Sequence, residues 1–213
     1  MKKTPSLELG RYWIPATAGS VIASLGLWWF LLKDVSLWFL RMLAYVPLAL
    51  LIAPGGLPPI AANPETGELT FNVLLNHDGR NPETGEPLHV DSIEFAADPR
   101  ISEYFTGGWF TFLGLSIPLG FSLSQWTRNV RGLAVQVGLS VLALALYAYT
   151  SALTVVVNGS GGGSALLMET LRVCKYLLTL VFPYAVPFAV ALLVHPQWRN
   201  YFGSSATPSK RKL

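Results

Sequence analysis

Charged side chains are scarce in this sequence: 13% of its 213 residues are Asp, Glu, Lys or Arg, whereas 52% are hydrophobic. A soluble domain normally carries about 25% charged residues. The scarcity is concentrated, because no charged residue occurs between Arg131 and Glu169 or between Lys175 and His195. Uncharged apolar runs of about 18 residues or more are typical of membrane-spanning helices. The composition therefore excludes an ordinary soluble domain and predicts a membrane protein.

Cysteine is almost absent too, and this limits the possible chemistry. The single Cys174 excludes an internal disulfide and any multi-cysteine metal site. The sequence contains no P-loop, dinucleotide-binding fingerprint or HExxH motif, so we expect no cofactor and no metal. Its net charge of +3 does not predict a nucleic-acid partner, because the basic residues lie where membrane topology requires them.

Four apolar segments are predicted to span the bilayer: Tyr12–Leu32, Tyr104–Leu123, Leu133–Val157 and Tyr176–Val194. The first is too long for the apolar region of a signal peptide and is followed by no small-x-small cleavage site, so we interpret it as a retained helix. The last could begin as early as Ala165. A fifth apolar run, Val35–Ala53, contains Arg41 and Pro47, and only Lys33 and Asp34 separate it from the first span.

The distribution of charge predicts the topology. With four spans, both termini share one side with nine of the fifteen basic residues and a single acid, Glu8. Those basic residues are Lys2, Lys3, Arg11, Arg128, Arg131, Arg199, Lys210, Arg211 and Lys212. The other side receives residues 54–103, with nine acids against Arg80 and Arg100. Because basic residues collect on the cytoplasmic side, we expect both termini in the cytoplasm and residues 54–103 on the outer side of the membrane, which in a bacterial inner membrane is the periplasm.

The tryptophans agree with this topology without any use of charge. All seven lie near the ends of predicted spans, where an amphipathic ring prefers the headgroup layer. Those expected at the inner face are Trp13, Trp126 and Trp198, and those at the outer face are Trp28, Trp29, Trp38 and Trp109. On this arrangement Val35–Ala53 lies in the outer interface or re-enters the membrane without crossing it.

The periplasmic insert is predicted to form a β-hairpin from Leu69–His77 and Leu88–Phe95, which are rich in Val, Ile, Phe and Thr. Pairing Phe71 with Phe95 and Val73 with Ile93 centres the turn near Glu83. The sequence Asn-Pro-Glu-Thr-Gly-Glu occurs there and also at residues 63–68. Both copies contain a Pro-x-Thr-Gly core like that of a sortase signal, but Pro and Gly beside strands are more typical of turns.

A lone hairpin is marginally stable in water, so its apolar face needs a cover. That cover is either Val35–Ala53 or a membrane-protein partner. The residues predicted to bind the partner are Phe71, Val73, Leu75, Ile93 and Phe95.

The fold class expected from these patterns is mainly helical and membrane-embedded. It has four transmembrane helices, an interfacial or re-entrant helix and a small periplasmic β-hairpin. Residues 1–53 hold the first span and the interfacial helix, residues 54–103 form the acidic insert, and residues 104–213 hold three spans and a basic tail.

Three functions are compatible with this organisation. The favoured one is a non-catalytic inner-membrane accessory subunit that binds a membrane-protein partner. An alternative is a thiol peptidase or transferase with Cys174 as its nucleophile and His77 or His89 as its base, since a thiol nucleophile requires a base within reach. A small transporter subunit is a third possibility, although no charge lies mid-membrane and no inverted repeat is visible.

The order of the segments resembles the small polytopic membrane proteins that accompany bacterial exosortases, in particular the exosortase H-associated family. The resemblance rests on the Pro-bearing stretch Tyr45-Val-Pro-Leu-Ala-Leu, the short β insert and the passage from Ile93 to Trp109 that leads into closely spaced spans. It implies an inner-membrane accessory of a system that processes the C-terminal sorting signals of exported proteins. The long acidic insert with its doubled turn departs from the family pattern.

Overall fold

The computed structural model describes residues 9–52, 58–62, 69–80, 84–97, 100–119, 122–160 and 164–198. The chain forms two compact units, each assembled from separate segments. The first unit comprises residues 1–32, 107–137 and 184–213, and the second comprises residues 33–106 and 138–183.

The N-terminal helix is longer than the sequence predicts. Helix α1 (Leu9–Leu27), the π-helical turn η1 (Trp28–Leu32) and helix α2 (Lys33–Ile52) follow one another without a break. The expected separation of Val35–Ala53 from the first span is therefore wrong. The junction contains no Gly or Pro to end a helix, and Lys33 Nζ lies 2.6 Å from a carboxylate oxygen of Glu103. Charged side chains do not interrupt the backbone hydrogen bonds of a helix, and the ion pair with Glu103 offsets part of the cost of placing Lys33 in an apolar run.

The remaining helices are α3 (Arg100–Ser116) with the 3₁₀ turn η2 (Ile117–Leu119), α4 (Leu123–Ser160), and α5 (Ala165–Tyr176), which continues through the π-helical turn η3 (Leu177–Val181) into α6 (Phe182–Val194). Three described helices are long and apolar enough to cross a membrane: Trp13–Ala49, Leu123–Gly159 and Ala165–Val194. The α-helical part of α3 has 17 residues, slightly fewer than the roughly 20 that a span needs. The mainly helical, membrane-type fold with a small sheet agrees with the expected class.

The start of α4 differs from the sequence-based boundary, whereas the start of α5 matches one of the two that were expected. α4 begins at Leu123 rather than Leu133, so residues 124–132, expected as a loop between two spans, are all helical. The backbone N–H of Gln125 donates a hydrogen bond to the Ser122 hydroxyl over 3.3 Å, which satisfies one of the free N–H groups of the first turn of α4. α5 begins at Ala165, the earlier of the two expected starts, and Ser164 accepts a hydrogen bond from the Leu167 amide as its N-cap.

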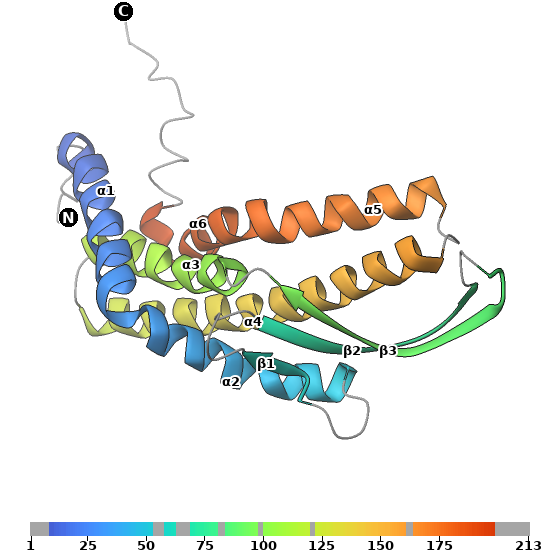
Figure 1. Ribbon diagram of the computed structural model, residues 1–213. Helices are drawn as coiled ribbons and strands as arrows, with labels where there is room; N and C mark the ends of the chain where they lie inside the picture. The colour runs from blue at the N-terminus through green and yellow to red at the C-terminus, as the bar shows by residue number, and fades with distance from the viewer. Residues whose placement is uncertain are drawn as a thin grey trace, which may run out of the picture. The chain divides into compact units, whose positions relative to one another are not determined.

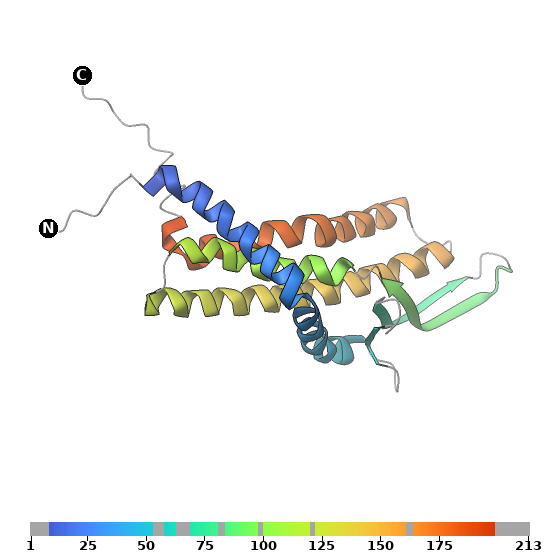
Figure 2. The same cartoon turned by 60° about the vertical axis from the view of Figure 1, so that its left-hand side comes forward.

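The insert is an antiparallel sheet of three strands in the order β1 (Ile60–Ala62), β2 (Leu69–Arg80) and β3 (Pro87–Ala97). Phe71 pairs with Phe95 and Val73 with Ile93, so the predicted register is confirmed. β2 and β3 form a long twisted ribbon (Figures 1 and 2). Gly85, in the second copy of the repeated turn sequence, has the positive φ of 73° that favours glycine.

Strand β1 is absent from the sequence-based prediction. It is only three residues long and Ile60-Ala-Ala shows no alternation of apolar and polar side chains. Its position depends on Asn72 of β2, whose side-chain amide donates to the Pro58 carbonyl over 2.8 Å and whose backbone amide donates to the Pro59 carbonyl over 3.1 Å. Such a long-range pairing leaves no local sequence signal.

In the first unit, α1 packs closely on α3 at Gly114. The Ser20 hydroxyl donates to the Gly114 carbonyl over 2.6 Å, and a Cβ placed at Gly114 would lie 2.5 Å from Val21 Cα. Only a residue without a side chain permits this approach, as is usual where membrane helices contact through small residues. A Cβ at Gly132 would likewise lie 2.2 Å from the ring of Phe112.

In the second unit, α2 contacts β1 and β2, so the apolar face of the sheet rests on this helix (Figure 1). This is the first of the two covers expected from the sequence. Phe105 of α3 also meets Phe182 edge-on, with ring centroids 5.9 Å apart.

The π-helical turn η3 precedes Pro183, which has no N–H to offer the Thr179 carbonyl. The Phe182 amide instead bonds to the carbonyl of Leu177, five residues earlier. Before Pro183 the helix therefore forms a wider, π-helical turn.

Candidate partner-binding surface

Helix α2 has two apolar faces with different surroundings. One face is buried, and its residues recur at helical spacing: Leu37, Leu40, Ala44 and Leu48. The opposite face is apolar but exposed, and its residues are Val35, Trp38, Phe39, Met42, Tyr45 and Val46. We refer to these six residues as the outer face of α2. A helix that is apolar all round is normally buried on all sides, so the outer face needs a cover of lipid or protein.

Covering the outer face of α2 would contribute substantially to the free energy of binding. Trp38 and Val46 are each 58% exposed and Met42 is 56% exposed. Burying one large apolar side chain contributes about 1.5–3 kcal/mol relative to leaving it in water. Leaving six such side chains of one helix in contact with water would therefore cost several kcal/mol of free energy.

Arg41 lies between the two faces of α2 and is half-buried. Its Nε is inaccessible to solvent and has no hydrogen-bond partner among the described residues. Asp34, seven residues earlier, is close enough for its charge to act on Arg41. The guanidinium therefore has an ionic neighbour on the same helix and an unused donor.

The structure places the five predicted partner-binding residues in different environments. Phe71 and Val73 are completely buried, whereas Ile93 and Phe95 are half-buried. Phe71 and Phe95 stack with ring centroids 5.5 Å apart. The side chain of Leu75 lies outside the described residues. Phe71 and Val73 thus belong to the core of the insert, and of the four residues whose side chains are described, only Ile93 and Phe95 are accessible to another molecule.

Strand β3 is an edge of the sheet, because no other strand in the described part of the chain pairs with its outer side. Its exposed side chains include Asp91, Ser92 and Glu94. An edge strand presents unpaired backbone groups to which an extended segment of another chain can add. The carboxylates would favour a basic segment.

A small ionic cluster lies along the hairpin. His89 Nδ1 is 2.5 Å from a carboxylate oxygen of Asp78, its cross-strand neighbour, and His89 Nε2 is 2.9 Å from Asp91. The hydrogen bond with Asp78 and the charges of both carboxylates raise the pKa of His89. Both ring nitrogens therefore act as donors when the imidazole is protonated, and the cation ties the two strands together.

Of the alternative thiol site, the structure describes the side chains of Cys174 and His89, which are not joined to each other, whereas the side chain of His77 lies outside the described residues. Cys174 is an exposed free thiol on α5, and neither hydrogen bonds nor ion pairs link it to another described side chain. His89 is bonded to two carboxylates, and the register places Val90 rather than His89 opposite His77. Beside Cys174, Arg172 pairs with Glu169 at 3.5 Å, and Lys175 lies over the ring of Tyr147. Arg172 and Lys175 therefore each interact with another side chain, Glu169 and Tyr147 respectively, as expected for charged residues at a membrane interface.

Two features were not expected from the sequence. The side chain of His195, predicted only to follow the last span, is completely buried, with Nε2 3.2 Å from the Ser116 hydroxyl and the ring stacked on Phe112. The second feature is the outer face of α2, which could have been found from a helical projection, since the stretch is apolar at nearly every position.

Within the described ranges, His, Cys, Asp and Glu form no group of three that could hold a metal ion. Comparisons with protein families, with curated proteins and with solved structures find no match for this chain.

Proposed function

We propose that this protein is a non-catalytic accessory subunit of the bacterial inner membrane and that it binds a membrane-protein partner through the outer face of α2. The observation that carries the proposal is that α2, which β1 and β2 contact, is apolar on two opposite faces, one buried and the other exposed. The chain itself covers the first face, so the partner covers the other.

The proposed topology has four spans with both termini in the cytoplasm and the sheet in the periplasm. The distribution of basic and acidic residues supports it. The continuous helix Trp13–Ala49 has 37 residues, about 55 Å at about 1.5 Å per residue. A hydrocarbon core is about 30 Å thick, so on this topology α2 extends into the outer interface. Its outer face is then available both to headgroups and to a neighbouring membrane protein.

The partner is proposed to be an integral membrane protein with a basic periplasmic segment. The insert's nine acids against two basic residues provide the complementary charge, and the free edge of β3 provides a place for that segment to add as a strand. The resemblance of the Tyr45–Leu50 stretch and of the passage from Ile93 to Trp109 to exosortase-associated proteins favours an exosortase-type sorting enzyme as this partner.

Site-specific photo-crosslinking in native membranes tests the proposal. A crosslinking amino acid at Met42 should capture one integral membrane protein, whereas the same amino acid at Leu166, which is 79% exposed on α5, should not. Met42→Lys should abolish co-purification of that protein in mild detergent, and Leu166→Lys should leave it intact. A monodisperse monomer without a partner, or equal capture from both positions, would refute the proposal.

A further inference from the structure

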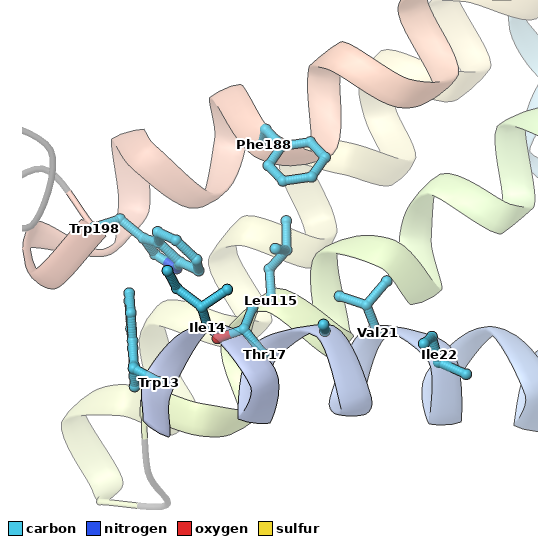
Figure 3. A pocket seen from close by; sticks show the side chains of 9 residues that line it. Trp13, Ile14, Thr17, Val21, Ile22, Leu115, Phe188 and Trp198 are labelled. Carbon is cyan, nitrogen blue, oxygen red and sulfur yellow. The ribbon is translucent and has the colours of Figure 1, made fainter. Parts of the chain in front are cut away.

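The first unit contains an open apolar groove of about 450 Å³ that runs along α1. α1 supplies most of its wall, Leu115 of α3 lies at its floor, and Phe188 of α6 faces α1 across it (Figure 3). At one end Trp13 and Trp198 contact each other, with ring centroids 4.5 Å apart. Apart from Thr17, every lining side chain is apolar or aromatic.

The length of the groove matches one leaflet of a bilayer. It extends along α1 from Trp13 to Ile22, which is about 13 Å at about 1.5 Å per residue. Half of a hydrocarbon core is about 15 Å. Tryptophan rings favour the headgroup layer, so the end formed by Trp13 and Trp198 lies at the interface and the other end lies near the midplane.

The groove is open along one side, as the entry of a hydrocarbon chain from the bilayer requires. Ile14 and Ile22 are 60% and 71% exposed, so the groove opens sideways, in the direction from which a lipid chain would enter.

Positive charge lies at the tryptophan end. The backbone amide of Trp198 donates to the carbonyl of His195 over 3.1 Å, so these two residues share one helical turn. Arg128 is close enough to His195 for its charge to act on the imidazole. The sequence also concentrates basic residues on this side of the membrane, and the cytoplasmic leaflet carries anionic lipids that such residues attract.

From these observations we infer that the groove binds one acyl chain of an anionic phospholipid from the cytoplasmic leaflet, with the lipid headgroup facing Arg128. The site lies in the first unit, and the surface proposed to bind a protein partner lies in the second. The choice of the cytoplasmic leaflet rests on the topology proposed above, whereas lipid binding at the groove and capture of a protein partner can fail independently.

Native mass spectrometry of the purified full-length chain, titrated with phosphatidylglycerol or phosphatidylcholine of identical acyl chains, tests this inference. The wild-type chain should bind one phosphatidylglycerol in preference to phosphatidylcholine. Ala18→Phe, which places a ring in the groove, should weaken phosphatidylglycerol binding by about tenfold, equivalent to about 1.4 kcal/mol. Ala23→Phe is the matched control, because Ala23 is exposed on the same helix but does not line the groove.

A second pair of variants tests the headgroup. Arg128→Gln should weaken phosphatidylglycerol binding by about fivefold, the effect of one cation near an anionic lipid surface, and should leave phosphatidylcholine binding unchanged. Arg131→Gln, at an exposed position nearby, should change neither. If Ala18→Phe does not fold, Ala18→Leu fills the groove less and should give a smaller loss.

Wild-type affinity in the Ala18 variants would overturn the acyl-chain assignment, and equal binding of the two lipids would overturn the headgroup assignment. Retention of a second protein chain in place of lipid, lost in Ala18→Phe but not in Ala23→Phe, would mean that the groove takes a protein segment and would also refute the inference. Loss of lipid binding with partner capture intact would leave the proposed function standing.

Discussion

Replacement of Gly114 by alanine should destabilise the first unit substantially. The added Cβ would lie 2.5 Å from Val21 Cα and 3.0 Å from the Ser20 carbonyl oxygen. Both contacts are with backbone, so no flexible side chain can move aside and α1 must move away from α3. Overpacking of this kind typically costs about 1–3 kcal/mol.

The movement would also weaken the hydrogen bond from the Ser20 hydroxyl to the Gly114 carbonyl. Such bonds between membrane helices contribute about 0.6 kcal/mol on average and up to about 1.7 kcal/mol. The expected loss of unfolding free energy for Gly114→Ala is therefore about 2–4 kcal/mol. This exceeds the gain of about 1 kcal/mol that alanine ordinarily gives over glycine in a helix.

Unfolding of the purified chain in mixed micelles of mild detergent and dodecyl sulfate, followed by tryptophan fluorescence, measures this loss. Gly26→Ala is the matched control, since a Cβ at Gly26 meets nothing within 4 Å; it should leave the stability unchanged or raise it by up to about 1 kcal/mol. Equal stability of Gly114→Ala and the wild type, or equal losses in both variants, would refute the close approach of α1 and α3.

Three further predictions concern the second unit and the topology. Because the pKa of His89 is raised, its contribution to hairpin stability should be fully present below its unfolded pKa of about 6.5 and should be lost as the pH rises through the folded pKa; an NMR titration in which Asp78→Asn leaves this pKa unchanged would contradict the assignment. Leu40→Ala should cost about 2–5 kcal/mol because Leu40 is completely buried, whereas Met42→Ala, on the outer face of α2, should change the stability of the isolated chain by less than about 0.5 kcal/mol; similar losses would mean that the two faces are wrongly assigned. Alkaline phosphatase fused at Gly79 should be active and a cytoplasmic fluorescent reporter at the C-terminus should fluoresce, whereas an inactive phosphatase fusion at Gly79 would exclude a periplasmic sheet.

The hairpin register could be predicted because it depends on neighbouring sequence. Strands of alternating apolar residues on either side of a turn permit few pairings, since a slip of one residue would turn Phe71 and Val73 to the opposite face. The positive φ of Gly85 follows from the same turn chemistry. Strand β1 could not be predicted, because its three residues are ordered by pairing with Leu69–Phe71 of another strand, and Asn72 of that strand binds the carbonyls of Pro58 and Pro59 just before β1.

The continuity of α1 and α2 was mispredicted for a related reason. Lys33 and Asp34 look like a loop in a hydropathy profile, but a helix ends where its backbone hydrogen bonds end. Lys33 remains helical while its ammonium group reaches Glu103, which is 70 residues away in the sequence. Hydropathy registers the cost of a charge in an apolar run but contains no information about a distant partner that offsets it.

The sequence by itself determined the membrane class, the position of the acidic insert and the pairing of its two long strands, because long uncharged runs, charge asymmetry and strand alternation are local properties. Only the tertiary structure decided which face of α2 is buried and which is exposed, since both faces are equally apolar in the sequence. It also decided that Trp13 and Trp198 meet at the end of one groove, and that Gly114 is required where α1 and α3 touch. These features arise when residues far apart in the chain come within contact distance, which no local pattern specifies.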